Sequence, residues 1–151
     1  MSREVRRVPS TWEHPKSTNG RYIPLLKESY EAAVQRRREY KPEEHNGCSV
    51  DDWYGPLDQP RMPHWPDEAR THYQMYESTS EGTPISPVMA SPEELAHWLV
   101  DNEASAFACM TATYEQWLAT CREGWAPSAA ITDGRLMSGV EAMGLQKREE
   151  P

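Results

Sequence analysis

Four side chains in the middle of the chain have the chemistry to bind a metal ion: His45, Cys48, His64 and His72. Zinc sites in proteins usually contain two close pairs of ligands. Here His45 and Cys48 form one close pair, but seven residues separate His64 from His72. We therefore expect no metal site, and no motif indicates another cofactor.

No motif places a catalytic site in the chain. The sequence contains no GxSxG, GxGxxG or HExxH motif and no P-loop. Hydrolytic carboxylate pairs are defined by their distance in the fold rather than by sequence spacing. An enzyme therefore stays an alternative hypothesis, with a site near residues 76–87, which combine a phenol, carboxylates, hydroxyls and two stiffening prolines. We predict no catalytic residue; under the alternative enzyme hypothesis, His14 and Glu77 would be the residues whose substitution abolishes activity.

Charge is distributed unevenly along this chain of formal net charge −8. Residues 1–41 hold ten Lys and Arg against five Asp and Glu, whereas residues 42–105 hold two against thirteen. An acidic surface repels nucleic acid and anionic lipid and attracts basic protein surfaces. We therefore predict binding to a basic protein surface, without direct contact to nucleic acid or membrane. The other open interpretation is a solvated surface that keeps the protein soluble.

The predicted partner-binding residues are carboxylates and aromatic side chains of this acidic middle. Trp is common among residues that dominate binding energy, and prolines lower the entropy lost when a loop is ordered against a partner. The predicted residues are Asp51, Asp52, Trp53, Tyr54, Asp58, Asp67, Glu68, Glu77 and Glu81.

The elements that must position these residues begin with a short edge strand over 3–8, which stops at Pro9. Ser29 is placed to cap a helix that runs to residue 40 and ends before Pro42. Five prolines predict an irregular loop over 42–66. A helical turn over 66–69 and a strand over 71–79 follow, because polar and apolar residues alternate there.

The strongest local signal starts the C-terminal part. Ser91 at the cap, Pro92 and two glutamates predict a helix over 91–102. A second helix is predicted over 113–122, followed by a hairpin of residues 128–132 and 135–138 and a short helix over 139–143. The hairpin turns at Asp133-Gly134, a favoured two-residue turn.

This order of elements predicts a small α+β domain over residues 1–146, with a mainly antiparallel sheet, two or three helices, a long Pro-rich loop and a frayed tail over 147–151. Six Trp and seven Tyr argue against wholesale disorder. No apolar run reaches the length of a membrane span, and no apolar segment follows the charged start, so we expect a cytoplasmic protein without a signal peptide. Three cysteines without a CxxC motif predict free thiols, with Cys109 buried between Phe107 and Met110.

Several segments resemble a family of small proteins from tailed phages and prophages of proteobacteria. The matching segments are EVRRVP with WEHP near the N-terminus, YQMYE leading into EGTPISP, and WAPS near residue 125. The resemblance implies a phage accessory protein in the host bacterial cytoplasm, and it carries over no catalytic residues.

That setting favours one function among several. Small acidic phage proteins without enzyme motifs resemble inhibitors of host defence, including anti-CRISPR proteins, whose carboxylates replace phosphates on nucleic-acid-binding surfaces. We therefore predict a non-enzymatic inhibitor whose partner is a host defence protein or ribonucleoprotein complex. A small phage enzyme acting on a nucleotide or modified base, and a virion or assembly component, stay open, as does the oligomeric state.

Overall fold

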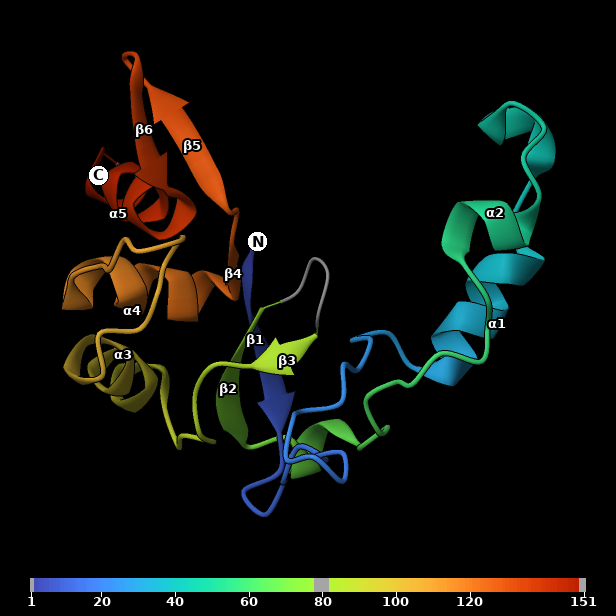
Figure 1. Ribbon diagram of the computed structural model, residues 1–151, viewed down its shortest axis with the longest axis horizontal. Helices are drawn as coiled ribbons and strands as arrows, with labels where there is room; N and C mark the ends of the chain where they lie inside the picture. Colours follow the sequence, from blue (N-terminus) through green and yellow to red (C-terminus); the bar gives the residue numbers. More distant parts are fainter. Residues whose placement is uncertain (1, 78–81, 150–151) are drawn as a thin grey trace. The chain divides into compact units, whose positions relative to one another are not determined.

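The computed structural model describes residues 2–77 and 82–149 of the chain (Figure 1). The chain forms two compact units: unit 1 comprises Met1–Ile23 and Trp65–Pro151, and unit 2 comprises Pro24–His64. The predicted α+β class with a mainly antiparallel sheet is confirmed. The predicted single domain over residues 1–146 stays a prediction.

A four-stranded antiparallel sheet forms the centre of unit 1. Strand β1 (Arg3–Val8) pairs with β2 (His72–Glu77) along its whole length. The two-residue strands β3 (Thr83–Pro84) and β4 (Trp125–Ala126) complete the order β3-β2-β1-β4. The prediction that β1 is an edge strand was wrong, because β4 returns from far along the sequence to pair with its first two residues.

Three helices accompany the sheet in unit 1: α3 (Pro92–Asp101), α4 (Tyr114–Glu123) and α5 (Gly139–Glu149). Side chains from all three helices and from β1, β2 and β4 meet in one core. Its largest fully buried members are Met75, Leu95, Leu99, Trp117 and Val140. Burial of such side chains contributes about 1.5–3 kcal/mol each.

The predicted helix signals of unit 1 are confirmed. The Ser91 hydroxyl accepts a hydrogen bond from the backbone N–H of Glu94 at 3.1 Å, at the start of α3. Thr113 and Gln116 form a reciprocal capping box at the start of α4. Gly124 ends α4 with φ of 99°, a left-handed conformation that favours glycine.

The predicted hairpin is also present, as β5 (Ala129–Thr132) and β6 (Arg135–Ser138). Asp133 and Gly134 have φ of 51° and 75°, as the favoured two-residue turn requires. Helix α5 follows directly and is longer than predicted. Residue 147, expected in a frayed tail, is helical, and its ammonium group lies 3.4 Å from the Glu123 carboxylate on α4.

Unit 2 contains α1 (Tyr30–Arg38), the 3-10 turn η1 (Pro42–His45) and α2 (Val50–Tyr54). Ser29 caps α1 as predicted. The segment 42–66, predicted to be irregular, contains η1 and α2. Ser49 nucleates α2 because its hydroxyl accepts from the Asp52 N–H at 3.1 Å, and two aspartates complement the helix dipole in the first turn.

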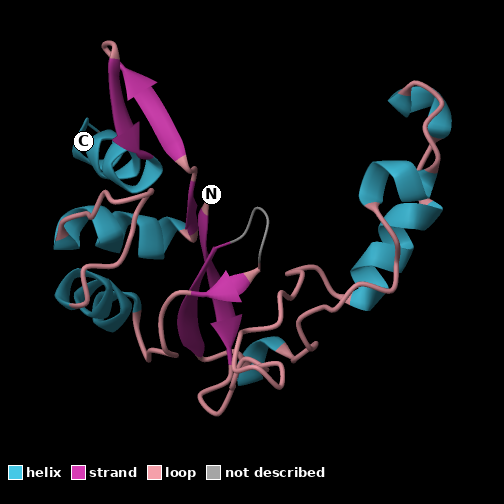
Figure 2. Cartoon of the chain, in the orientation of Figure 1, coloured by secondary structure: helices cyan, strands magenta, loops and turns pink. Residues whose placement is uncertain are grey.

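Loops make up most of the segment between β1 and α1 (Figure 2). The short turn η2 (Asp67–Ala69) lies where one helical turn was predicted.

Among the helices of the described residues, none has the length and apolar character that a membrane span requires.

The cysteines divide into one buried and two exposed thiols. Cys121 is buried in the core, and Cys48 and Cys109 are exposed. The prediction that Cys109 is buried was wrong. Ala108 has φ of 50° in a tight turn between Phe107 and Met110, and the thiol that follows it is exposed.

Thiol reactivity should follow this division. Burial raises the pKa of the Cys121 thiol to about 12, and the nearby Glu93 carboxylate adds to the rise. Since the thiolate is the reactive form, a disulfide reagent should modify two thiols quickly and the third only after unfolding. Mass mapping should assign the fast sites to Cys48 and Cys109. Rapid modification of Cys121 in the folded protein would contradict this packing.

The Ser91 cap should contribute measurably to stability. Ser91→Ala leaves a backbone donor of α3 without its partner and should lower the free energy of unfolding by about 1 kcal/mol. Ser10→Ala, at an exposed serine outside any helix, is the matched control and should change little. Chemical denaturation monitored by circular dichroism measures both. An equal midpoint for the two variants would exclude Ser91 as a stabilising cap.

Candidate functional site

The predicted partner-binding residues fall into both units. Four of them form consecutive positions of α2 in unit 2, and Asp58 follows in the same unit. Asp67 and Glu68 form η2 in unit 1, Glu77 ends β2, and Glu81 lies outside the described residues. The predicted acidic surface is therefore divided between two compact units, and its role in binding stays a prediction.

In unit 2, α2 presents its Trp to solvent beside a row of rings. Trp53 is 51% exposed, and its ring centroid lies 4.3 Å from that of His45. His45 stacks on Tyr40 at 4.8 Å with an interplanar angle of 6°, and Tyr40 meets the edge of Tyr54 at 5.6 Å. The Arg36 guanidinium covers the other end of the row, 3.9 Å from the Tyr54 centroid. These five side chains are called the ring row below.

The carboxylates beside the ring row are held in place. Asp51 forms a 2.6 Å ion pair with Arg37, which also donates to the Gly55 carbonyl. Asp52 accepts a hydrogen bond from the Ser49 hydroxyl at 2.7 Å. Both aspartates remain exposed. Arg37 therefore compensates one charge of α2, whereas no ion pair within the described residues involves Asp52 or Asp58.

Arg36 and Arg37 thus have roles in the site that the sequence analysis did not predict. Arg36 pairs with Glu28 at 2.7 Å and covers Tyr54, and Arg37 joins α1 to α2. Tyr40 and His45 were also missed as parts of the site. The only sequence signal was a concentration of aromatic residues between 40 and 54, and it does not reveal which rings stack.

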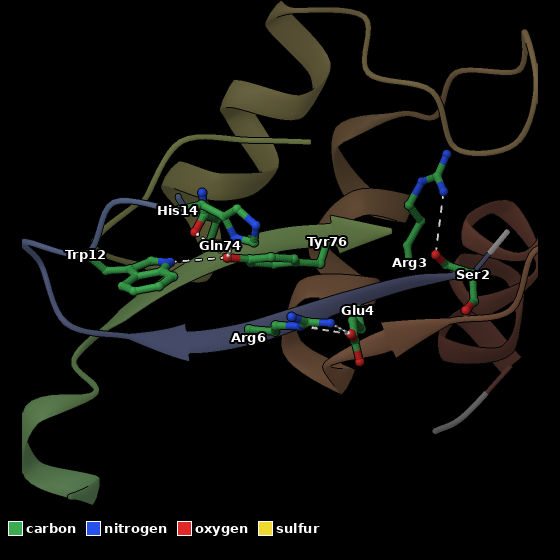
Figure 3. A network of polar contacts seen from close by, with 8 residues as sticks. All are labelled: Ser2, Arg3, Glu4, Arg6, Trp12, His14, Gln74 and Tyr76. Carbon is green, nitrogen blue, oxygen red and sulfur yellow. Dashed lines mark hydrogen bonds and ion pairs between the residues drawn. The ribbon is translucent and has the colours of Figure 1, made fainter. Parts of the chain in front are cut away.

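In unit 1, a buried polar network lies close to the site proposed for the alternative enzyme (Figure 3). The hydroxyl of Tyr76, a fully buried residue of β2, accepts from the Trp12 indole at 3.2 Å. Nδ1 of His14 lies 2.9 Å from this hydroxyl, and Gln74 Oε1 lies 3.1 Å from it. Arg6 stacks over the Tyr76 ring at 4.2 Å.

Hydrogen-bond geometry fixes the tautomer of neutral His14. Its Nε2 lies 2.6 Å from the Ile23 carbonyl oxygen, which only accepts, so Nε2 carries the proton. Nδ1 is then the acceptor of the ring, and the single proton of the Tyr76 hydroxyl has two acceptors in reach, Nδ1 and Gln74 Oε1. The Gln74 amide is oriented by its own donation to the Ser86 carbonyl at 2.8 Å.

Burial sets the protonation of this network. Desolvation lowers the pKa of His14, the Ile23 carbonyl opposes that shift, and the positive charge of Arg6 adds to it. Desolvation also raises the pKa of the Tyr76 phenol. Both side chains are therefore held in their neutral forms near neutral pH.

A pocket of about 630 Å³ lies beside this network, lined by Trp12, His14, Lys16, Tyr22 and Gln74 among others. Nε2 of His14 is engaged by the Ile23 carbonyl, and Nδ1 faces the Tyr76 hydroxyl, whose proton it shares with Gln74 Oε1. Through these contacts His14 fastens the segment after β1 to Tyr76 of β2.

Glu77, the other candidate for catalysis, is half-buried and lies opposite Arg3 in the β1–β2 register. Its negative charge opposes the lowering of the Arg3 pKa by burial. Among the described residues, no cluster of three His, Cys, Asp or Glu side chains is placed to hold a metal ion. The four candidate metal ligands divide between the units, with His72 on β2 and the other three in unit 2.

Comparison of the chain with protein-family models, with curated proteins and with solved structures returned no match.

The His14 network should make stability depend on pH. Because folding lowers the pKa of His14 below its ordinary value of about 6.5, the unfolded chain binds the proton more tightly. The free energy of unfolding should therefore fall as the pH drops below about 6.5.

Urea denaturation at a series of pH values measures this effect. His14→Gln removes the titrating group and should reduce the acid loss of stability, whereas His64→Gln, at an exposed histidine, should leave it unchanged. Identical pH profiles for the wild type and His14→Gln would show that His14 does not titrate within a buried network.

Proposed function

We propose that this protein is a non-enzymatic inhibitor of a host defence system, from a phage or prophage, that acts in the bacterial cytoplasm. It binds a basic, nucleic-acid-binding surface of a host defence protein or ribonucleoprotein complex. The observation that carries the proposal is the half-exposed Trp53, which packs against His45 and is flanked by exposed carboxylates. We call Asp51, Asp52, Trp53, Tyr54 and Asp58 the α2 surface.

Pre-ordering supports a binding role for this surface. An immobilised side chain costs about 0.5–1.5 kcal/mol of entropy when a complex forms. The Trp53 ring already packs against His45, and Asp52 is already bonded to Ser49. The α2 surface therefore loses little freedom on binding, and Trp is the residue most often found at the energetic centre of interfaces.

Charge supports the proposed kind of partner. Between residues 42 and 60 the chain has five carboxylates and no Lys or Arg. Basic surfaces that hold phosphates attract carboxylates in the same way, and such attraction raises association rates at low salt. Asp67 and Glu68 of η2 belong to unit 1, so they extend the acidic character without belonging to the α2 surface.

The first test is a phage-protection assay in bacteria that carry defined nucleic-acid-targeting defence systems. Expression of the wild-type chain should restore plaque formation against one of them. Trp53→Ala should abolish this restoration or weaken binding to the purified effector by roughly 30-fold, about 2 kcal/mol. Trp125→Ala is the matched control, because Trp125 is 52% exposed and lies in unit 1.

Charge variants compare how much the carboxylates of each unit contribute to inhibition in the same assay. The set Asp52→Lys and Asp58→Lys should weaken inhibition and reduce the salt dependence of the association rate. Asp51 is kept, because its ion pair with Arg37 joins α1 to α2. The set Asp67→Lys and Glu68→Lys should have a smaller effect, and Asp101→Lys with Glu103→Lys serves as the control at exposed carboxylates.

The outcomes discriminate between the hypotheses. Failure to counteract any defence system in the panel would exclude the proposed function. Full activity of both α2 variants, with activity lost in His14→Gln or Glu77→Gln of unchanged stability, would favour the alternative enzyme acting on a nucleotide or modified base near residues 76–87.

A further inference from the structure

The β5–β6 hairpin carries an exposed apolar pair that nothing described above explains. Ile131 and Leu136 lie directly opposite each other in the hairpin and are 75% and 50% exposed. Their neighbour Met137 faces the other way and is 4% exposed. The base of the hairpin, with Met137 and Ser138, is therefore packed, whereas Ile131 and Leu136 near the turn are exposed to solvent. The hairpin extends beyond α5 in Figure 1.

The outer edge of β5 is open to another strand. Within the described residues, the backbone of β5 hydrogen-bonds only to β6. In an antiparallel pair every second residue directs its N–H and C=O to the outer edge. Four consecutive residues of β5, Ala-Ala-Ile-Thr, contain no charge and no proline.

The other described strands lack such an open, uncharged edge. Natural sheets protect their edges with very short strands, prolines or charged residues. The edge strands of the four-stranded sheet, β3 and β4, have two residues each, and β3 ends in Pro84. Strand β6 contains Arg135, which pairs with Glu141 of α5 at 2.6 Å. Strand β5 alone among these described strands combines length with an uncharged edge.

We propose that two copies of this chain associate through antiparallel pairing of their β5 strands, joining the two hairpins into a four-stranded sheet. Pairing about a two-fold axis at Ile131 places the two Ile131 side chains opposite each other. Ala130 then faces Thr132 of the second copy, and the pairing ends there because Asp133 belongs to the hairpin turn. No like charges meet along the junction, although each copy has a net charge of −8.

A second copy of this chain fits the edge of β5 better than a basic protein does. Strand β5 has no carboxylate, so charge does not attract a basic protein to it. A second copy supplies a strand of matching length and an aliphatic side chain at the matching position, and a closed two-fold pair satisfies both edges at once. The association involves neither the α2 surface nor the His14 network, so it is independent of the proposed function.

Sedimentation velocity of the full chain over a range of concentrations tests the association. The wild type should shift from monomer to dimer as concentration rises. Ile131→Lys places two ammonium groups opposite each other and should abolish the dimer. Leu136→Lys adds the same charge on β6, one strand away from the junction, and should preserve most of the dimer. Circular dichroism checks that the variants remain folded.

Cross-linking tests the register. In a chain with Cys48→Ser and Cys109→Ser, an added Ile131→Cys should form a reducible dimer on mild oxidation. Directly opposite residues have Cα atoms about 4.5–5.5 Å apart, within the range of a disulfide. Leu136→Cys in the same background should not cross-link.

Each remaining result decides against the proposal. A monomer at all concentrations, without cross-linking of Ile131→Cys, would overturn it. A dimer that survives in Ile131→Lys would place the interface elsewhere on the chain.

Discussion

The pairing of β1 with β2 holds unit 1 together, and the other features of the unit depend on it. Six residue pairs align Arg3 with Glu77 and Val8 with His72. That register points Met75 into the helix-covered core and leaves Tyr76 on the opposite face, where the segment after Pro9 crosses it. The His14 network can form only because β1 ends where it does. A shift of the register by one residue would exchange Met75 and Tyr76 between the two faces.

Unit 2 depends on a different interaction. It has few buried apolar residues, and Arg37 joins α1 to α2 through Asp51 and the Gly55 carbonyl. This contact sets the position of α2 and therefore of Trp53. The same aspartate contributes to the acidic character of the surface and is partly neutralised by the arginine that holds it. The charge available to attract a partner is thus smaller than the sequence count suggests, and the aromatic contact gains importance.

Much of the fold could be predicted because its signals are local. Ser91 with Pro92, the Thr113–Gln116 capping box and the Asp133-Gly134 turn each satisfy nearby backbone groups, so a few neighbouring residues determine the outcome. Two predictions were wrong because they depend on more than local signals. The exposure of Cys109 depends on a left-handed turn at Ala108. The interior position of β1 depends on a strand that returns after residue 124.

The sequence by itself determined the acidic middle of the chain, its aromatic content and most helix and strand positions, since composition and short-range hydrogen bonds require no partner from elsewhere. Only the tertiary structure decided how the predicted residues are grouped. It assigned Asp52 and Trp53 to one compact unit and Glu68 and Glu77 to the other. It also brought the Tyr76 hydroxyl of β2 to Nδ1 of His14, because the segment that carries His14 follows β1, and β1 pairs with β2.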